Sequence, residues 1–179
     1  MSNGSRAADQ ALRRLFFALA CEQAPRQAIA RWRAELPLRA GRRVPSENFH
    51  LTLMFLGDVP LAQINAVCET AASVTPPGGP LVIELDRLEL WHRSAALVLT
   101  SSQTPAMLRQ FVYALHQALL PLGFEDTQKD YRPHLTLMRD YRGPHPEASS
   151  APAFRLVSQR FVLYESHKGG YRPLAEWGL

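Results

Sequence analysis

The sequence predicts an α+β fold in one compact domain, and three observations carry this prediction. Strand-like and helix-like segments are mixed along the chain, short turns at several junctions favour antiparallel pairing, and 46% of the 179 residues are apolar. A chain of this length and composition buries a sizeable core. Residues 1–14 are small, polar and charged, so we expect a flexible N-terminal tail before a domain that spans 15–179.

The first half of the chain predicts two strands, each followed by a helix. The apolar run 15–20 has the residues of a strand, and the segment 25–36 repeats its apolar residues at helical spacing. A second strand is expected over 49–56. Asp58, which follows this strand, can cap a helix with an apolar stripe over 61–71.

The second half of the chain predicts four strands and one long helix. Strand-like runs over 81–90 and 95–100 are joined by a short turn. The most regular helical pattern of the chain follows over 105–120, with a proline at its start. Two further strands are expected over 134–138 and 160–164.

Two features of the composition bear on where the protein works. The longest apolar run, 15–21, has seven residues, whereas a transmembrane helix needs about 20, so we expect no membrane span. Cys21 and Cys68 are the only cysteines and have no CxxC spacing, which argues against a disulfide framework. We therefore expect a soluble protein of the reducing cytoplasm.

Arginine dominates the positive charge. The formal net charge is +4, and the twenty cations are eighteen arginines and two lysines. Six of the arginines lie in 26–43, and because the guanidinium group suits phosphate oxygens, this segment is a candidate surface for RNA or another polyanion. A solvated helix face in an arginine-rich chain explains the same pattern equally well.

One pentapeptide occurs twice. His50-Leu51-Thr52-Leu53-Met54 recurs unchanged at 134–138, each time inside a strand-like run. Side chains alternate between the two faces of a strand, so each copy directs its histidine and threonine to one face and its leucines to the other. If each copy belongs to its own half of the fold, and the halves pack about an approximate two-fold axis, His50 and His134 lie on opposite sides of one cleft.

Paired histidines and threonines in this arrangement suit displacement at phosphorus. One imidazole removes a proton from the attacking oxygen and the other protonates the leaving oxygen. The hydroxyls of Thr52 and Thr136 donate to the non-bridging oxygens, and the design demands no metal. A zinc site is a weaker interpretation, because each repeat offers a single good ligand. An ordinary half-buried strand explains one copy of the motif but not an identical second copy.

The paired motifs resemble those of the two-histidine (2H) phosphoesterases, and the wider sequence is similar to bacterial and archaeal RNA 2′,3′-cyclic phosphodiesterases of the LigT/ThpR type. The resemblance rests on both His-x-Thr motifs and on the segments 14–19, 44–57, 121–124, 131–134 and 163–166. It implies a bilobal fold of two pseudo-symmetric lobes, each with an antiparallel sheet and flanking helices, around a cleft. It also implies hydrolysis of a terminal 2′,3′-cyclic phosphate to a 2′-phosphate without a metal or cofactor.

The resemblance implies roles for the two histidines and for one arginine. His50 is the proton donor to the 3′ oxygen, and His134 is the proton acceptor that activates water. Arg139 stands where the family commonly has an arginine near the phosphate. The odd spacing between His134 and Arg139 requires a strand end or a bulge to bring both side chains to one face.

Three further residues are candidates for substrate binding. Arg132 precedes the second motif at a position similar to one in the family, with a structural ion pair as the alternative. Phe16 and Tyr131 are candidates to stack on a base, since aromatic rings bind bases of any sequence. Core packing is the alternative for Phe16.

Two alternative functions stay open at this point. The same site serves joining of RNA ends through a 2′,5′ linkage, or opening of a small cyclic nucleotide. A non-catalytic RNA-binding module would instead use the arginines of 26–43 and predicts binding that weakens steeply with salt. In each case the expected partner is RNA or a cyclic nucleotide, with no membrane and no obligatory protein partner.

Overall fold

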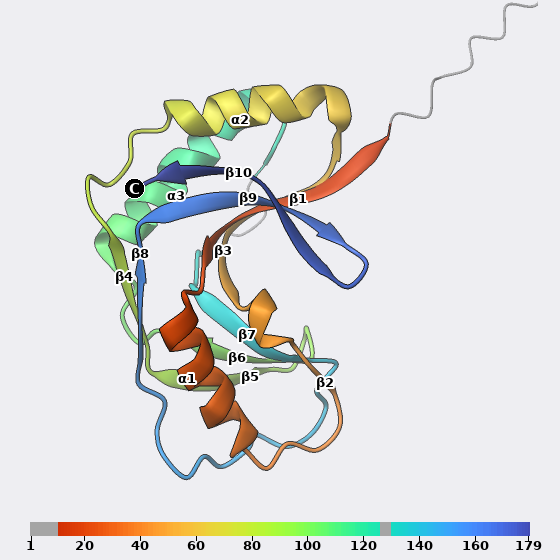
Figure 1. Cartoon of the computed structure of the whole chain (residues 1–179), viewed down its shortest axis with the longest axis vertical. Helices are drawn as coiled ribbons and strands as arrows, with labels where there is room; N and C mark the ends of the chain where they lie inside the picture. Colours follow the sequence, from red (N-terminus) through yellow and green to blue (C-terminus); the bar gives the residue numbers. More distant parts are fainter. Residues whose placement is uncertain (1–10, 126–129) are drawn as a thin grey trace, which may run out of the picture.

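The computed structural model describes residues 11–125 and 130–179, which form an α+β arrangement of ten strands and three α-helices (Figure 1). Two four-stranded antiparallel sheets form two lobes, and a two-stranded ladder connects them. The predicted fold class is confirmed. Residues 1–10 of the expected tail lie outside the described residues. None of the helices in these two ranges has the length and apolar character of a membrane span.

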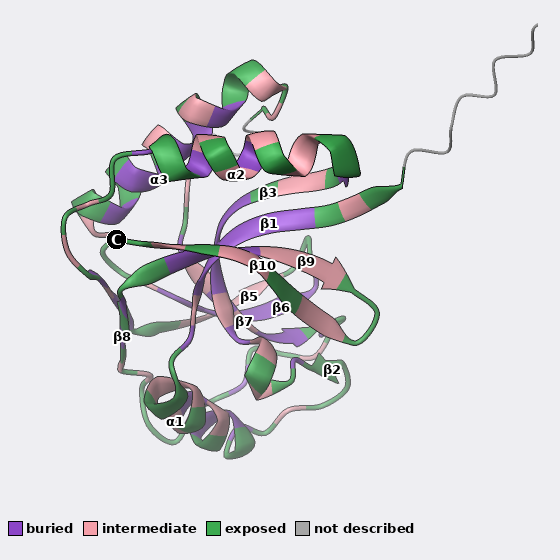
Figure 2. Cartoon of the chain, turned by 45° about the horizontal axis from the view of Figure 1, so that its top comes forward, coloured by how far each residue is buried: buried purple, intermediate pink, exposed green. Residues whose placement is uncertain are grey.

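The upper lobe of Figure 1 is built on a sheet whose central strands are buried. Its order is β10 (Gly170–Gly178), β9 (Arg160–His167), β1 (Leu12–Ala20) and β3 (His50–Pro60). Helices α2 (Ile64–Ser73) and α3 (Ala106–Leu119) cover its outer face, and β1 is buried along most of its length (Figure 2). Phe111 of α3 packs edge-on against Phe161 of β9, with ring centroids 5.0 Å apart, so helices and sheet share one core.

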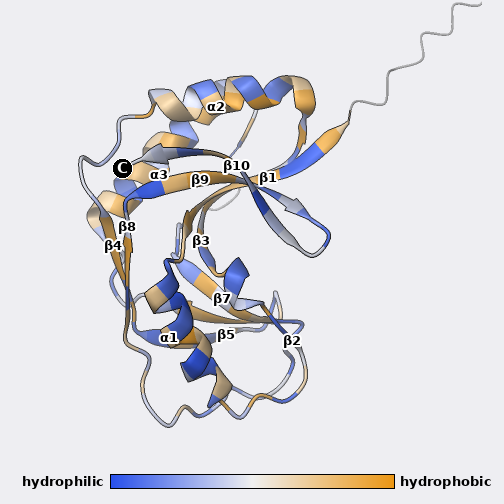
Figure 3. Cartoon of the chain, viewed as in Figure 1, coloured by the Kyte–Doolittle hydropathy of each residue, from blue (hydrophilic) through white to orange (hydrophobic). Residues whose placement is uncertain are grey.

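The lower lobe contains the second sheet, in the order β2 (Arg42–Arg43), β7 (His134–Arg139), β6 (Ala96–Thr100) and β5 (Arg87–Trp91). Helix α1 (Gln23–Ala34) lies beside this sheet and carries hydrophilic residues along its length (Figure 3). One of them, Arg33, is buried and donates hydrogen bonds to the backbone carbonyls of Val44 and Leu137. Arg33 therefore fastens α1 to β7.

A ladder of β4 (Leu81–Leu85) and β8 (Phe154–Ser158) joins the lobes, because β4 leads into β5 below and β8 leads into β9 above. Trp32 of α1 packs against Phe154 of β8, with ring centroids 5.6 Å apart. This contact anchors the ladder to the lower lobe.

The two copies of the repeated pentapeptide begin β3 and β7, so each lobe contains one copy. The two strands contact each other where the sheets meet. The leucines at both positions of each copy are at most 2% exposed, which confirms that they point into the core: Leu51, Leu53, Leu135 and Leu137. The prediction that each half of the fold holds one copy is also confirmed.

Both copies carry a β-bulge at the second leucine. The register between β1 and β3 skips Leu53, and the register between β6 and β7 skips Leu137. A bulge shifts the alternation of side chains by one residue. Residues five positions after each histidine, Phe55 and Arg139, therefore return to the face that carries the histidine. The odd spacing requires a bulge or a strand end to bring Arg139 to the same face as His134, and the bulge at Leu137 does so.

Two boundaries near the start of the chain differ from the sequence prediction. Strand β1 begins at Leu12 rather than at residue 15, because it pairs with β3 as far as Pro60 and because Arg13 forms an ion pair with Glu165 of β9 at 3.1 Å. Strand β3 continues past Gly57, which adopts a φ of 73°. Asp58 therefore lies in the strand, opposite Arg14, and does not cap a helix.

Further differences concern strands with weak sequence signals. The expected strand 81–90 divides at Asp86, whose carboxylate accepts a hydrogen bond from the backbone N–H of Ser102 at 2.7 Å, into β4 and β5 of different sheets. Strands β2, β8 and β10 were not predicted. Strand β8 leaves Val157 39% exposed, and β10 contains Pro173 beside a register shift, so neither shows a clear apolar alternation.

Candidate active site

The ring of His50 is held by hydrogen bonds on both nitrogens. Its Nδ1 lies 2.7 Å from the carbonyl oxygen of Asn48, which can only accept, so Nδ1 carries the proton. Its Nε2 lies 3.1 Å from the hydroxyl of Thr52, which donates to it in the neutral ring. The motif thereby fixes both the orientation of the imidazole and its tautomer.

His134 repeats the same local geometry in the other lobe. Its Nδ1 lies 2.9 Å from the carbonyl oxygen of Arg132, again the residue two positions before the histidine. Nδ1 is therefore the protonated nitrogen in both rings, and Nε2 carries the lone pair in both, which in His50 accepts from Thr52. Thr136 follows at the position that corresponds to Thr52 and is half-buried.

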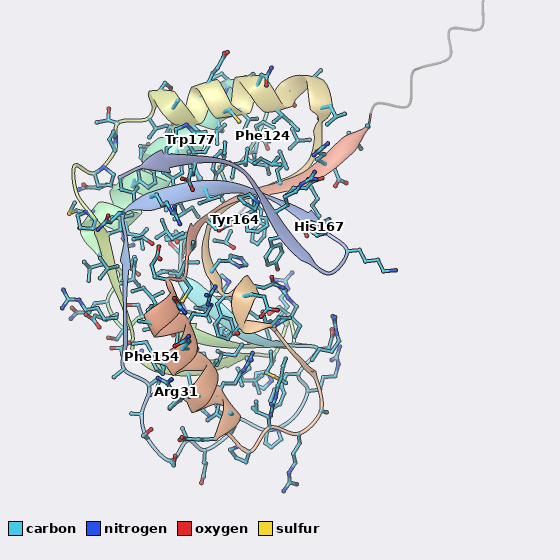
Figure 4. The ribbon with its side chains drawn as sticks, viewed as in Figure 1. Arg31, Phe124, Phe154, Tyr164, His167 and Trp177 are labelled. Carbon is cyan, nitrogen blue, oxygen red and sulfur yellow. The ribbon has the colours of Figure 1, made fainter. Side chains whose placement is uncertain are left out.

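Aromatic side chains of the upper sheet pack around His50. The rings of Phe16 and Tyr171 each lie 5.0 Å from the imidazole, Phe16 tilted and Tyr171 edge-on. Tyr164, which Figure 4 labels on β9, stacks on Phe16 at 5.5 Å. Phe16 is only 3% exposed, so its contacts are those of a packing residue that supports His50.

The ring of His134 lies against Trp91 from the end of β5. Their centroids are 4.5 Å apart with an interplanar angle of 53°. The guanidinium of Arg132 lies over the Trp91 ring, 5.5 Å from its centroid. Nη2 of Arg132 also donates to both carboxylate oxygens of Glu89, at 2.8 and 3.0 Å. Arg132 is thus engaged in the ion pair that the sequence left as an alternative.

The electrostatics of the site keep both imidazoles neutral in the free protein. Burial lowers the pKa of His50 from 6.5 to about 4, and the charges of Arg139 and His134 add to this effect. Burial also lowers the pKa of His134, with further contributions from Arg132 and Arg139. The positive charge of Arg139 thus acts on both histidines, and the strands that carry the two motifs contact each other.

A pocket of about 350 Å³ lies beside Arg139 and next to His50, from which the rings of Phe16 and Tyr171 separate it. It is lined by Arg14, Leu15, Phe16, Phe55, Gly57, Arg139, Ser166 and Tyr171. Arg139 reaches toward the upper lobe, with Nη2 at 3.4 Å from the hydroxyl of Tyr171. Phe55 is 58% exposed, which is unusual for a phenylalanine in a strand. The pocket thus combines two cations with aromatic surface, a combination suited to a nucleotide.

Tyr131 connects the two motifs. Its hydroxyl donates to the carbonyl oxygen of Thr52 at 2.9 Å, so a residue just before β7 is bound to the backbone of β3. Burial raises the pKa of the phenol, which keeps it protonated as a donor. The proposed stacking of Tyr131 on a base stays a prediction.

The arginines of 26–43 are spread over separate places. Arg33 is buried, Arg42 forms an ion pair with Asp140 at 2.7 Å, and Arg31 lies exposed on α1 (Figure 4). The buried Arg33 therefore does not belong to a surface for RNA, and RNA binding by the other five arginines stays a prediction. No three or more His, Cys, Asp or Glu side chains are grouped for metal binding within 11–125 and 130–179.

Sequence reasoning did not identify several residues of the site. Glu89 falls in the run 81–90 that the sequence predicts as one strand, Trp91 falls in the turn expected after it, and Tyr171 lies in the unpredicted β10. Phe55 could have been found from the sequence, because an alignment of the two repeats gives it the same position as Arg139, directly after the five identical residues. The two histidines and two threonines were all predicted, and the structure brings the two motifs together.

Comparison with known proteins gives consistent matches. The model of the LigT-like phosphoesterase family matches residues 19–97. The RNA 2′,3′-cyclic phosphodiesterase of Escherichia coli is 33% identical over 175 residues, which cover 93% of this chain and 96% of that protein. The enzyme of the same name from Geobacillus stearothermophilus is 31% identical over 164 residues, 85% of this chain and 52% of that protein. The crystal structure of E. coli LigT complexed with 3′-AMP superposes with a TM-score of 0.83 at 31% identity, covering 94% of this chain and 99% of that chain.

Proposed function

The chain belongs to the LigT-like phosphoesterase family, and we propose that it hydrolyses the 2′,3′-cyclic phosphate ends of RNA to 2′-phosphates. One observation carries this proposal. Two imidazoles, one from each lobe, each have Nδ1 bound to a backbone carbonyl, and the strands that carry them contact each other. In-line displacement at phosphorus needs a proton acceptor and a proton donor placed in this way.

The reaction follows from the two Nε2 atoms. Nε2 of His134 takes a proton from water, whose oxygen attacks phosphorus and forms the new P–O bond. The bond between phosphorus and the 3′ oxygen breaks on the opposite side, and Nε2–H of His50 donates the proton that this oxygen needs. Protonation of Nε2 of His50 ends the bond that it accepts from Thr52, and the hydroxyls of Thr52 and Thr136 then donate to the non-bridging oxygens as negative charge develops on them.

His50 needs a proton before it can act as the donor. Burial lowers its pKa to about 4 in the free protein. A phosphate anion beside Nε2 has the opposite effect, because a neighbouring negative charge favours the protonated ring. Binding of the substrate therefore raises the pKa of His50, so that its ring takes up a proton from solvent and can act as the proton donor.

The pocket beside His50 is the place for the terminal nucleotide. Arg139 binds the phosphate from the end of β7, and the exposed ring of Phe55 offers a stacking surface for the base. Phe16 supports His50 from below and forms one wall of the same pocket. Arg132 acts through its ion pair with Glu89.

The experiment is a product analysis in EDTA. Purified protein is incubated with a short RNA that ends in a 2′,3′-cyclic phosphate, beside the His134→Ala variant and a His92→Ala control in an exposed turn. We expect a 2′-phosphate from the wild type and the control, and none from His134→Ala. A 3′-phosphate, or turnover by His134→Ala, would contradict the proposed chemistry.

The same assay separates hydrolysis from the other uses of this site. Adding an RNA with a 5′-hydroxyl end tests for joining, which would give a longer 2′,5′-linked product. Binding that survives substitution of both histidines, with no product from any RNA, would instead identify a binding module. We also propose a cytoplasmic location, because both cysteines are free thiols; cell fractionation tests it.

A further inference from the structure

Glu89 accepts hydrogen bonds from three side chains that all belong to the surroundings of His134. Oε2 accepts from the indole N–H of Trp91 at 2.8 Å, and Oε1 accepts from the hydroxyl of Thr100 at 2.9 Å. Nη2 of Arg132 donates to both oxygens. The side chain of Glu89 is 26% exposed, so these bonds are partly shielded from water.

Each of the three donors is directly connected to His134. The Trp91 ring packs on the imidazole at 4.5 Å. The Arg132 carbonyl accepts the Nδ1–H of His134, so the position of this residue fixes the tautomer. Thr100 is the partner of His134 across the β6–β7 ladder. The carboxylate of Glu89 therefore binds three residues that contact His134: one packs on its ring, one accepts its Nδ1–H, and one lies opposite it on the neighbouring strand.

We propose that Glu89 is a positioning residue for His134: it holds Trp91 and Arg132 in the places that keep the imidazole oriented with Nε2 toward the substrate. The inference rests on the proposed function of His134 as the proton acceptor. Glu89 does not itself line the pocket beside His50. Its effect passes through its three partners.

The charge of Glu89 supports this role. Burial alone raises the pKa of the carboxyl, but the hydrogen bonds from Trp91, Thr100 and Arg132 outweigh burial and hold the pKa below its ordinary value of 4.5. Glu89 is therefore a carboxylate at neutral pH. It offsets the positive charge of Arg132, which on its own lowers the pKa of His134.

His50 is held in a different way. Its ring packs against Phe16 and Tyr171, and its hydrogen bonds go to the Asn48 carbonyl and to the Thr52 hydroxyl of its own motif. The two motifs are thus alike in their first hydrogen bond and unlike in their support. This asymmetry fits two histidines that take opposite parts in proton transfer.

The test begins with Glu89→Gln, which keeps the shape of the side chain and removes its charge. We expect kcat to fall by about tenfold to a hundredfold, because a small displacement of a catalytic group has an effect of this order. We expect KM to stay within about twofold, because Glu89 does not touch the substrate. Glu84→Gln on β4, an exposed residue paired with Arg155, is the matched control and keeps wild-type kinetics.

The pH profile separates positioning from general damage. In Glu89→Gln the charge of Arg132 is no longer offset, so the pKa of His134 falls and the acid limb of kcat/KM moves to lower pH. In Arg132→Gln the positive charge is removed, so the same limb moves to higher pH. Opposite shifts in the two variants support the inference. Identical shifts, or a wild-type kcat in Glu89→Gln, overturn it.

A readout without turnover keeps the two proposals distinguishable. NMR of the imidazole nitrogens reports the tautomer and pKa of His134 in the absence of substrate. We expect one Nδ1–H tautomer in the wild type, and a mixture and a lower pKa in Glu89→Gln. If the wild type hydrolyses no cyclic phosphate, the proposed function fails while this measurement still decides the role of Glu89. An unchanged His134 spectrum in Glu89→Gln contradicts the role.

Discussion

Phe55 and Arg139 occupy equivalent positions in the two lobes. Each lies five residues after the histidine of its repeat, each follows a bulge at the second leucine, and both line the pocket beside His50. The repeat therefore extends by one position beyond the five identical residues, and at this sixth position the lobes differ. One lobe contributes an aromatic surface and the other a cation, which are the two groups that a nucleotide needs.

Arg139→Gln should weaken substrate binding. A charge-assisted hydrogen bond to phosphate contributes about 1.5–3 kcal/mol, so we expect KM to rise by roughly tenfold to a hundredfold. Steady-state kinetics at two salt concentrations measure this change, and the salt dependence of KM should become shallower. Arg109→Gln, an exposed arginine on α3, is the control with the same loss of charge. Equal effects of both variants would contradict a specific contact at Arg139.

Phe55→Ala should lose affinity for the base alone. Stacking of a base on an aromatic ring contributes about 1–3 kcal/mol. We expect the binding of a nucleoside 2′,3′-cyclic phosphate to weaken accordingly, and the binding of a ribose 2′,3′-cyclic phosphate without a base to stay unchanged. Calorimetric titration of both ligands into the His134→Ala protein measures this difference without turnover. Equal losses for the two ligands would remove Phe55 from base recognition.

A substrate with a good leaving group can test which histidine is the proton donor and which is the proton acceptor. A p-nitrophenyl phosphodiester needs no proton on its leaving oxygen, so loss of the proton donor should cost it little. We expect His50→Ala to keep most of its activity on this ester while it loses hydrolysis of the cyclic phosphate. His134→Ala should lose both activities. The reverse pattern would exchange the two roles.

The stability of the fold should fall as pH is lowered through the range of histidine titration. The pKa of His50 is about 4 in the folded protein and about 6.5 when unfolded, so the unfolded chain binds an extra proton between these values. The contribution of His50 to stability is then complete above pH 6.5 and decreases toward pH 4, by roughly 3 kcal/mol for this one group. Urea unfolding at several pH values measures the slope. His50→Gln should flatten it, and an unchanged slope would argue against burial of a neutral His50.

Arg33→Met should destabilise the fold more than a surface arginine does. The guanidinium donates to the carbonyls of Val44 and Leu137, and Leu137 is the bulged residue of β7. Loss of these buried bonds costs about 2 kcal/mol. Arg31→Met, on the exposed side of the same helix, should stay within about 0.5 kcal/mol. Chemical unfolding of both variants decides this, and equal stabilities would show that Arg33 does not hold the bulge.

The parts of the site that the sequence predicted follow from simple periodicity. His50 and Thr52, and likewise His134 and Thr136, fall on one face because side chains alternate along a strand. Two identical copies of the motif predict two similar local structures, and each lobe contains one of them. The long helix α3 was predicted within two residues because its apolar stripe and its initial proline agree.

The parts that the sequence did not predict depend on contacts between distant segments. Glu89 is an ordinary surface residue by type, and only the pairing of β5, β6 and β7 brings it to Arg132, for which the sequence predicted an ion pair as an alternative without naming the partner. Strand β10 forms because β9 offers a partner, although Pro173 disfavours a strand by itself. The bulges at Leu53 and Leu137 do not change the apolar pattern of the sequence. The sequence alone therefore could not show that Arg139 lies on the same face of the strand as His134.

The order of the strands in the sheets has a consequence for how this enzyme folds. The chain crosses between the lobes repeatedly, and β1 pairs with β9, so that Arg14 meets Ser166 across the sheet. Neither lobe is a continuous stretch of sequence, and the upper sheet is not complete before β9 and β10, the last two strands of the chain, have been synthesised. Contacts between such distant residues make folding slow and link the two halves in one cooperative transition. A fragment that contains His50 but lacks β9 should therefore leave β1 without this partner and fail to form the upper lobe, and the two histidines become an active pair only when the whole chain has folded.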